Sequence, residues 1–456
     1  MPYADFRAFL KVLRDKRELI DIDRHVPLTD VSKVMKHSYV RQGPALQFND
    51  TGADHPLVSN IYSTRSKALL AFEADESTIF EKVLKGLDNP IPSEPWSGPA
   101  PCHEVIITGD DIDLTRLPVP TYSSKDGGPY ITPGLVVSKD PETGVPDIGH
   151  YRFLILGKNI VSFSAQPFHR FGKNIIKCRQ MGVKCEAAIV LGVDPVIAYA
   201  AQVQVHDQTD DWALAGGLRG APIEMVRAHS VDLEVPATAE FVIELEVDLE
   251  KNVMEGPLGE YTGYYTPASM KPLAYIKAIT HRKGGLFQGL LTGKPITENH
   301  ILKQIPFEAS LWRTLSRQFP TIRQIAVSPA GGVSFHMVIA MEPRFAGEAR
   351  QVILAAMTSN TRPKWVIVVD PDIDVRNSNE VDWALSFRVR PARDIIVIDN
   401  LPAGPSDPSV DLSRPRPERI SSAVGVDATR PFGEPFSEVA DVPGWEDFDV
   451  PELDGR

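Results

Sequence analysis

Cysteine is scarce in this chain, and long apolar runs are absent from it. Its three cysteines, Cys102, Cys178 and Cys185, are too few for a disulfide framework, and the last two lack the paired short spacing of a zinc site. The N-terminus has no signal-peptide core, and no stretch is apolar enough to span a bilayer. We therefore expect a cytoplasmic protein with reduced thiols and no membrane partner.

Positive charge is also in deficit. Lysine and arginine number 48 against 60 aspartates and glutamates, which gives a net charge of −12. A general nucleic-acid binder needs a basic face for phosphates, so no nucleic-acid partner is expected. The glycines in SPAGGVSF and LAGGLRGAP form neither a GxGxxG pattern nor a P-loop lysine motif, so neither is assigned to a nucleotide.

What remains is an ordinary globular composition on a chain too long for one core. With 456 residues, 43 % apolar and 24 % charged, two or three domains are expected. The predicted divisions are an N-terminal domain over 1–100, a central domain over 101–305 and a C-terminal domain over 306–456.

The first domain reads as α/β. A helix is predicted near the N-terminus, where four apolar residues recur at helical spacing after Asp5, a possible cap: Phe6, Phe9, Leu10 and Leu13. NPIPSEPWSGPAP, residues 89–101, is too rich in proline for a regular element and predicts a linker.

The central segment is dominated by short β-type runs. A hairpin is predicted to turn at Gly157-Lys158-Asn159, and a second at Lys283-Gly284-Gly285 in LAYIKAITHRKGGLFQGLL. DLEVPATAEFVIELEVDLE alternates apolar and polar residues, which predicts a half-buried antiparallel strand pair. Together these runs predict a β-barrel or split barrel over about 105–300.

An α/β pattern returns after residue 305. GEARQVILAAMTS and EVDWALSFRVRP predict helices, while WVIVVDPDIDV and DIIVIDNLP predict strands. The tail from Ala403 onward, rich in proline and acid, is expected to be a loose extension or an arm onto a partner subunit.

EGPLGEYTGYY is the most unusual segment, because two carboxylates flank a Gly-Pro-Leu-Gly bend. Glycine and proline exclude a regular helix or strand, so the bend can bring Glu255 and Glu260 to one cavity. Two carboxyls in a water-poor cavity resist double ionisation, and one can then act as a general acid. An exposed polar loop is the alternative.

DIGHYR contains an arginine, Arg152, in an otherwise apolar run. A buried guanidinium needs an anionic partner, and its fork matches a carboxylate, so Arg152 can anchor a substrate carboxylate. An outward-facing arginine on an alternating strand is the alternative.

Three oxygen or imidazole ligands, Asp147, His169 and Asp211, lie in or near strand-rich segments and suit Mg²⁺ or Mn²⁺, although a capping or solvated role is the common alternative. The three aspartates of VVDPDIDV lack the glycine and terminal glutamate of a calcium loop, so a structural role at a strand end is favoured for them.

Taken in order, these segments resemble the UbiD-like decarboxylase family. EGPLGEYTGYY resembles its signature bend, DIGHYR its Asn-x-Gly-x-Tyr-Arg, and DWALAGGLRGAPIEMV its Glu-Tyr-x-x-Ala-Gly-x-Leu-Arg-Gly stretch; the similarity ends near Ser409. The resemblance implies an α+β protein with an N-terminal α/β domain, a central split β-barrel that binds flavin, and a C-terminal α/β domain for oligomerisation.

The resemblance also implies the site. The catalytic set falls on Arg152, Glu255 and Glu260, and the metal ligands on Asp147, His169 and Asp211, which hold Mn²⁺ or Mg²⁺ against the flavin phosphate, with K⁺ nearby in some members. Two ligands depart from the family pattern, because Asp147 replaces an asparagine and Asp211 a glutamate. The implied contacts to prenylated FMN are Ile148, Gly149, Tyr151, Arg152, Ser164, Gln166, Pro167, Phe168, His169 and Arg170.

The implied function is reversible, non-oxidative decarboxylation of aromatic, heteroaromatic or α,β-unsaturated acids, with Glu260 as proton donor. Side chains alone supply no electron sink for this reaction, so a cofactor is needed. The implied partners are the acid, CO₂, a flavin prenyltransferase that supplies the cofactor, and further copies in a homodimer or homohexamer. Two alternatives are a flavin-binding subunit of a multi-subunit aryl carboxylase and a two-carboxylate glycosidase.

Overall fold

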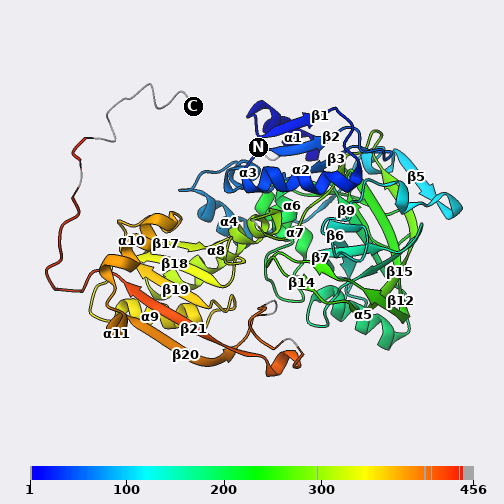
Figure 1. Ribbon diagram of the computed structural model, residues 1–456. Coiled ribbons are helices and arrows are strands. Elements are labelled where there is room, and N and C mark those ends of the chain that lie inside the picture. Colours follow the sequence, from blue (N-terminus) through cyan, green and yellow to red (C-terminus); the bar gives the residue numbers. More distant parts are fainter. Residues whose placement is uncertain (1–2, 295, 405–406, 412, 441, 445–456) are drawn as a thin grey trace.

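The computed structural model describes residues 3–294, 296–404, 407–411, 413–440 and 442–444. The end of the predicted tail, residues 445–456, lies outside this part of the chain. Figure 1 shows an α+β molecule in which the N-terminal elements lie above a central barrel and a C-terminal sheet stands beside it. In the described part of the chain, no helix has both the length and the apolar character that a membrane crossing requires.

The N-terminal unit is a small sheet covered by helices. Its first helix, α1 (Phe6–Asp15), buries the four predicted apolar residues, and Asp5 caps it by accepting a hydrogen bond from Ala8 N, so this prediction is confirmed. The sheet has the order β1-β2-β3-β16. The other elements of the unit are β1 (Leu19–Ile22), α2 (Leu28–Val40), β2 (Ala45–Phe48), β3 (Leu57–Ser59), α3 (Arg65–Ala71) and α4 (Ile79–Asp88).

The central unit is a closed barrel of six strands. Its order is β12-β9-β6-β7-β8-β15, and the pairing of β12 with β15 closes the ring. Closure pairs both edges of every strand, so the barrel confirms the predicted fold class. Its strands are β6 (Tyr130–Lys139), β7 (Pro146–Ile155), β8 (Ile160–Phe163), β9 (Cys185–Leu191), β12 (Phe241–Glu255) and β15 (Ser269–His281).

Short elements connect and flank these strands. The hairpin predicted at Gly157-Lys158-Asn159 is confirmed by the antiparallel pairing of β7 with β8. The connecting elements are β4 (Glu94–Pro95), β5 (Val105–Thr108), α5 (Arg170–Met181), α6 (Pro195–Ala200), α7 (Asp211–Arg219), β10 (Glu224–Arg227), β11 (Glu234–Pro236), β13 (Leu258–Gly259), β14 (Tyr265–Thr266) and β16 (Phe287–Gln288).

Two predicted strand pairs were wrong. The alternating stretch over 232–250 does not fold onto itself, because β11 pairs with β10 while β12 pairs with β9 and β15. The chain does turn after β15, but β16 leaves the barrel and pairs in parallel with β3 of the N-terminal sheet. In both cases the strand pairs with a strand that is distant in sequence, and the predicted pairing with the neighbouring segment does not form.

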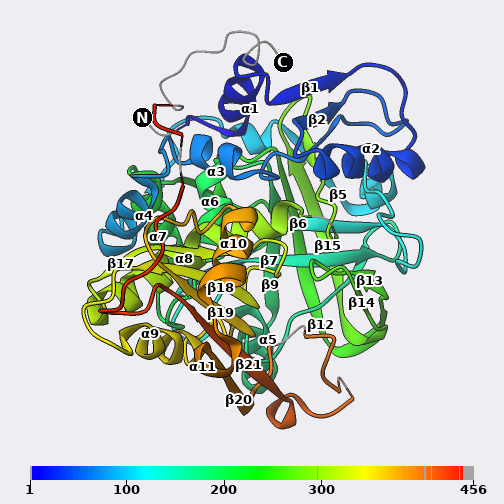
Figure 2. The same cartoon turned by 60° about the vertical axis from the view of Figure 1, so that its left-hand side comes forward.

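The C-terminal unit is a five-stranded sheet with the order β17-β18-β19-β21-β20. Residues of α9 (Glu348–Met357) are buried in one apolar core and those of α10 (Ser378–Arg388) in another, so helices cover both faces (Figure 2). The strands are β17 (Ile322–Val327), β18 (His336–Met341), β19 (Trp365–Val369), β20 (Ile395–Pro402) and β21 (Ile420–Ala428), and α11 (Pro391–Asp394) precedes β20.

The prediction of a loose tail from Ala403 onward was wrong for part of that segment. β21 lies inside the sheet, parallel to β19 on one side and antiparallel to β20 on the other. A strand at this position is held by two ladders of backbone hydrogen bonds. The aspartates of VVDPDIDV are structural as favoured, since Asp370 and Asp372 form ion pairs with Arg388 and Arg430.

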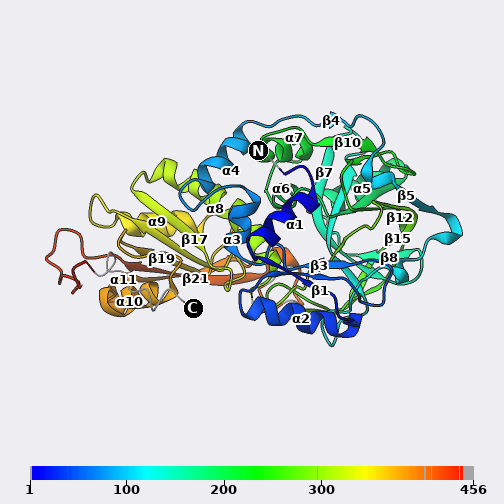
Figure 3. The same cartoon turned by 90° about the horizontal axis from the view of Figure 1, so that it is seen from above.

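A long helix, α8 (Glu298–Gln318), lies between the barrel side and the C-terminal sheet (Figures 1 and 3). Its Glu308 is fully buried and binds Arg65 of α3 at 3.0 Å and Arg376, which follows β19, at 2.8 Å. Through these two pairs, Glu308 joins the N-terminal and C-terminal units. Removing a buried carboxylate from such a pair is strongly destabilising.

Candidate active site

Arg152 on β7 gathers both signature glutamates. Its Nε and Nη2 contact the Glu255 carboxylate at 3.2 and 3.4 Å, and its Nη1 forms an ion pair with Glu260. Glu255 is fully buried, whereas the Glu260 side chain retains 24 % of its exposure. The structure therefore brings Arg152, Glu255 and Glu260 together, and the more accessible carboxyl is the one positioned to meet a substrate.

The bend between the two glutamates is held by its backbone. β12 ends at Glu255, and Gly256 follows with φ +98°, a conformation that L side chains rarely adopt. Asp126 then accepts a hydrogen bond from Gly259 N at 2.9 Å, and Gly127 N donates to the Pro257 carbonyl at 2.9 Å. These contacts turn the chain so that the second glutamate faces the same arginine as the first.

Two residues of this cluster were missed from the sequence. Tyr130, the first residue of β6, donates from its hydroxyl to Glu255 at 3.0 Å, and burial with the nearby carboxylate raises its pKa. Lys271 lies on β15 opposite Val253, and burial lowers its pKa while Glu255 opposes that effect. Neither residue belongs to a recognisable motif, and only the strand register of the barrel places them here.

A second cluster surrounds Arg170 at the start of α5. Its guanidinium contacts Asp147 of β7 at 3.4 Å and Asp211 of α7 at 2.7 Å. Both carboxyls are nearly buried, and burial raises the pKa of Asp147 to about 6 and raises that of Asp211. Asp211 also accepts a hydrogen bond from Ile148 N at 2.8 Å. The buried carboxyls of Asp147 and Asp211 therefore share the Arg170 guanidinium.

The predicted third ligand, His169, lies next to Arg170 in the sequence. It precedes α5, and its ring centroid lies 6.2 Å from that of Tyr151 on β7. Among the residues that the structure describes, no three histidine, cysteine, aspartate or glutamate side chains are grouped to hold a metal. The donor set of Asp147 and Asp211 fits a hard cation, and the three-residue ligand set stays a prediction.

The remaining predicted flavin contacts lie on β7 and on the segment before α5. Ile148 is buried and Gly149 and Tyr151 are partly buried on β7; Ser164 and Gln166 are partly exposed, and Pro167 and Phe168 are exposed. Gly172 lets this segment lie against α5, since a Cβ there would stand 2.0 Å from the Gln166 carbonyl oxygen. Their role as flavin contacts stays a prediction.

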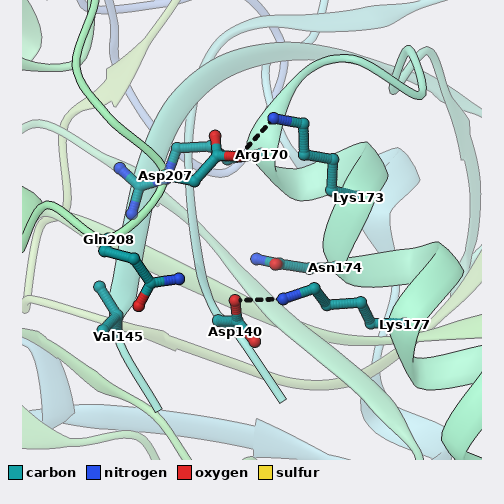
Figure 4. A pocket seen from close by; sticks show the side chains of 8 residues that line it. All are labelled: Asp140, Val145, Arg170, Lys173, Asn174, Lys177, Asp207 and Gln208. Atoms are coloured by element: carbon teal, nitrogen blue, oxygen red, sulfur yellow. Dashed lines mark hydrogen bonds and ion pairs between the residues drawn. The ribbon is translucent and has the colours of Figure 1, made fainter. Parts of the chain in front are cut away.

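A small pocket opens beside the Arg170 cluster (Figure 4). Lys173 and Lys177 of α5 line it, but they are paired with Asp207 at 2.5 Å and with Asp140 at 2.6 Å. The positive charges of these two lysines are therefore largely neutralised by carboxylates of the protein itself. The pocket is lined by Asp140, Val145, Arg170, Lys173, Asn174, Lys177, Asp207 and Gln208.

The chain matches a known family along most of its length. Three domain models of 3-octaprenyl-4-hydroxybenzoate carboxy-lyase match the chain: the N-terminal domain over residues 10–87, the Rift-related domain over 94–295 and the C-terminal domain over 300–428. The UbiD-class enzyme HmfF from Pelotomaculum thermopropionicum, solved with FMN, is 30 % identical with a TM-score of 0.92, and the match covers 99 % of this chain and 100 % of that one. The chain belongs to the UbiD family of carboxy-lyases.

Other solved structures match nearly the whole chain. Vanillic acid decarboxylase from Sedimentibacter hydroxybenzoicus in its open form is 28 % identical, with a TM-score of 0.88 and 98 % of each chain covered. The 3,4-dihydroxybenzoic acid decarboxylase AroY from Klebsiella pneumoniae is 26 % identical, with a TM-score of 0.88 over 96 % of this chain and 98 % of that chain. An evolved dimeric form of HmfF was solved with prFMN. It is 30 % identical, with a TM-score of 0.88, and the match covers 98 % of this chain and 99 % of that chain.

Proposed function

We propose that this UbiD-family chain is a reversible, non-oxidative decarboxylase that uses prenylated FMN. The observation that carries the proposal is the cluster of one guanidinium and two carboxyls, Arg152 with Glu255 and Glu260, in a member of this family. The FMN and prFMN complexes of HmfF support the cofactor. The acids named for the relatives, vanillic acid and 3,4-dihydroxybenzoic acid, support an aromatic carboxylic acid as substrate, and the proposal extends to heteroaromatic and α,β-unsaturated acids.

Arg152 is the anchor for the substrate carboxylate. Its Nη1 is held by Glu260 in this structure, while Nε and Nη2 are held by Glu255. A substrate carboxylate competes most readily for Nη1, because Glu260 is the more exposed of the two partners. Binding then releases Glu260 from the guanidinium, while Glu255 keeps Arg152 in place.

Glu260 is the proton donor. When bound, the prenylated flavin supplies the electron sink that decarboxylation at an sp² carbon requires. Once freed from Arg152, the Glu260 carboxyl loses the charge that favours its ionised form and can hold a proton. It delivers this proton to the substrate carbon after CO₂ has left, and Tyr130 and Arg152 keep Glu255 fixed meanwhile.

The Arg170 cluster is the proposed place of a divalent cation. Asp147 and Asp211 would hold Mn²⁺ or Mg²⁺ with His169 as the third ligand, and K⁺ would lie nearby. Such a cation binds phosphate oxygens, so it would tether the cofactor at its phosphate end. Asp147 and Arg152 lie five residues apart on β7, roughly 16 Å along an extended strand, so the proposed cation lies well apart from the Arg152 cluster.

We also propose that the chain acts as a homo-oligomer, a dimer or a hexamer, through its C-terminal unit. Large apolar side chains are exposed there, with Phe387 of α10 at 69 % and Val397 of β20 at 66 %. The dimeric form of HmfF supports such an assembly.

Expression with and without a flavin prenyltransferase tests the proposed function. Protein from the co-expressing strain should carry a modified flavin, visible in its absorbance spectrum, and should release CO₂ from some member of a panel of aromatic, heteroaromatic and acrylic acids. Protein made without the transferase is the control and should be inactive. A colourless protein that releases no CO₂ under either condition would contradict the proposal, and glycosidase activity in that protein would favour the two-carboxylate alternative.

A further inference from the structure

Glu260 stands at the start of the turn in a tight hairpin, residues 258–266, whose two strands β13 and β14 pair with each other. Glu260 N donates to the Tyr264 carbonyl at 2.9 Å, and the Glu260 carbonyl accepts from Gly263 N at 2.8 Å. Both backbone groups of Glu260 are therefore bonded within the hairpin. Its side chain is the part of the residue that can change partner while the hairpin stays intact.

Gly259, directly before Glu260, is bound from outside the hairpin. Residues of an antiparallel pair alternate between hydrogen-bonded and non-hydrogen-bonded positions, so the backbone groups of Gly259 point away from β14. Its N–H donates to Oδ1 of Asp126 at 2.9 Å, and its carbonyl accepts from the Thr292 hydroxyl. Two side chains from separate segments of the chain therefore hold the peptide groups that lead into Glu260.

Asp126 is itself fixed in a turn. Its backbone N donates to the Ser123 carbonyl at 3.0 Å, and its Oδ2 accepts from Ser123 N at 2.8 Å. Because Oδ2 is engaged in this way, Oδ1 is left to face Gly259. The same turn reaches the second strand of the hairpin, where Lys125 N donates to the hydroxyl of Tyr265 at 3.2 Å. The turn therefore lies along the hairpin and grips both of its strands.

We propose that Asp126 is a positioning residue for Glu260: it fixes the backbone at Gly259, so that the Glu260 carboxyl exchanges Arg152 for the substrate by rotation of its side chain alone. The inference rests on the proposed function, because it concerns the residue assigned there as proton donor. Asp126 binds the chain next to Glu260 and acts through it. A shift of about 1 Å at a catalytic group can reduce turnover by about 100-fold, so a loosened hairpin would be costly.

Two substitutions release the hairpin to different degrees. Asp126→Ala removes both acceptor oxygens. Asp126→Asn keeps the shape of the side chain but has one acceptor oxygen, so it can serve one of the two N–H groups, from Ser123 and Gly259, that the carboxylate serves now. Asp248→Ala is the matched control, because the Asp248 carboxylate on β12 also accepts from two backbone N–H groups of a local turn, both at 3.0 Å, outside the site.

The experiment measures kcat and KM of these holoenzymes with an acid that the wild type decarboxylates, and follows deuterium uptake of peptides covering residues 256–266. We expect Asp126→Ala to lower kcat by about 10- to 100-fold with KM within about twofold, because Glu255 still holds Arg152 for the substrate. Its peptides should exchange faster. Asp126→Asn should fall between Asp126→Ala and the wild type, Asp248→Ala should match the wild type, and all variants should keep the flavin absorbance.

A double-mutant cycle separates positioning from a general structural role. In the Glu260→Gln background, Asp126→Ala should cause no further fall in the residual kcat, because the carboxyl through which it acts is already gone. Equal fold losses in both backgrounds, or wild-type kcat in Asp126→Ala, would overturn the inference. If Asp126→Ala does not fold, Asp126→Asn takes its place in the cycle. If Glu260→Gln alone keeps wild-type turnover, the proposed function fails at its proton donor, while the exchange data still decide whether Asp126 holds the hairpin.

Discussion

Arg152 and Glu260 form an ion pair, although Arg152 lies on β7 and Glu260 lies on the bend after β12. The same guanidinium binds the fully buried Glu255 at 3.2 Å, so one cation serves two carboxylates of unequal exposure. Under the proposed function, the buried pair with Glu255 stays fixed, and the partly exposed pair with Glu260 is exchanged for the substrate carboxylate. Several consequences can be measured.

Glu260→Gln should abolish decarboxylation without emptying the site. The amide keeps the shape of the side chain but has no acidic proton, and loss of a general acid typically reduces kcat by about 10² to 10⁴-fold. Flavin absorbance should remain at the wild-type level, because Glu260 lies apart from the Arg170 cluster. The exposed Glu250→Gln on β12 is the control and should leave kcat unchanged. Wild-type kcat in Glu260→Gln would remove its role as proton donor.

Asp211→Ala should lower both the metal content and the flavin content of the purified protein. It removes one of two buried carboxyls that face Arg170 and leaves Asp147 alone to hold a cation. Metal analysis and the flavin spectrum measure the effect. Asp147→Asn, which restores the family's usual asparagine, should retain the metal, and Asp207→Ala beside the pocket should change neither quantity. Full metal and flavin occupancy in Asp211→Ala would exclude Asp211 from the cation site.

Gly172→Ala should destabilise the protein even though alanine is the better helix former by about 1 kcal/mol. The added Cβ would stand 2.0 Å from the Gln166 carbonyl, so the segment before α5 must move. We expect a lower Tm and less bound flavin. Gly157→Ala is the control, because a Cβ there meets nothing within 4 Å and its φ is not positive. An unchanged Tm and flavin content in Gly172→Ala would show that the close packing of this segment is unimportant.

Lys67 should make the free energy of unfolding rise with pH above 8. Its side chain is fully buried, and burial lowers its pKa from the ordinary 10.5 to about 8, which corresponds to about 3 kcal/mol. Between pH 8 and 10.5 the unfolded chain holds the proton that the folded chain has lost, so raising the pH favours folding.

Lys67→Met should flatten this dependence, as measured by urea unfolding at pH 7.5, 9 and 10. The exposed Lys33→Met is the control and should follow the wild-type slope. The same slope in Lys67→Met and in the wild type would assign the dependence to other groups.

Glu308→Gln should lower the free energy of unfolding by about 3–5 kcal/mol, because it leaves two guanidinium groups around a site that has lost its charge. Denaturant unfolding followed by tryptophan fluorescence measures the loss. The control is Asp88→Asn, which breaks an exposed pair with Arg313 and should change stability by at most about 0.5 kcal/mol. A similar small effect at both positions would show that Glu308 does not couple the units.

Much of the site could be predicted from the sequence, because its motifs are local. The Gly-Pro bend predicted that Glu255 and Glu260 could converge, and the apolar run around Arg152 predicted a need for an anionic partner. The structure shows both, in one cluster. The helix after Asp5 and the hairpin at Gly157-Lys158-Asn159 were predicted for the same reason, since caps and turns depend on a few neighbouring residues.

The remainder could not be predicted, because it depends on partners that are distant in sequence. Tyr130 reaches Glu255 only through the register of the barrel, and β16 pairs with β3 although it follows β15. Alternation and spacing report which face of an element is buried, and they carry no information on which element covers it.

The position of β21 has a consequence for how the protein is made. This strand, Ile420–Ala428, is inserted between β19 and β20, and β20 has no other strand partner among the described residues. During translation the C-terminal sheet therefore stays divided until β21 has left the ribosome. The nascent chain meanwhile presents the open edge of β19, which a chaperone would need to shield.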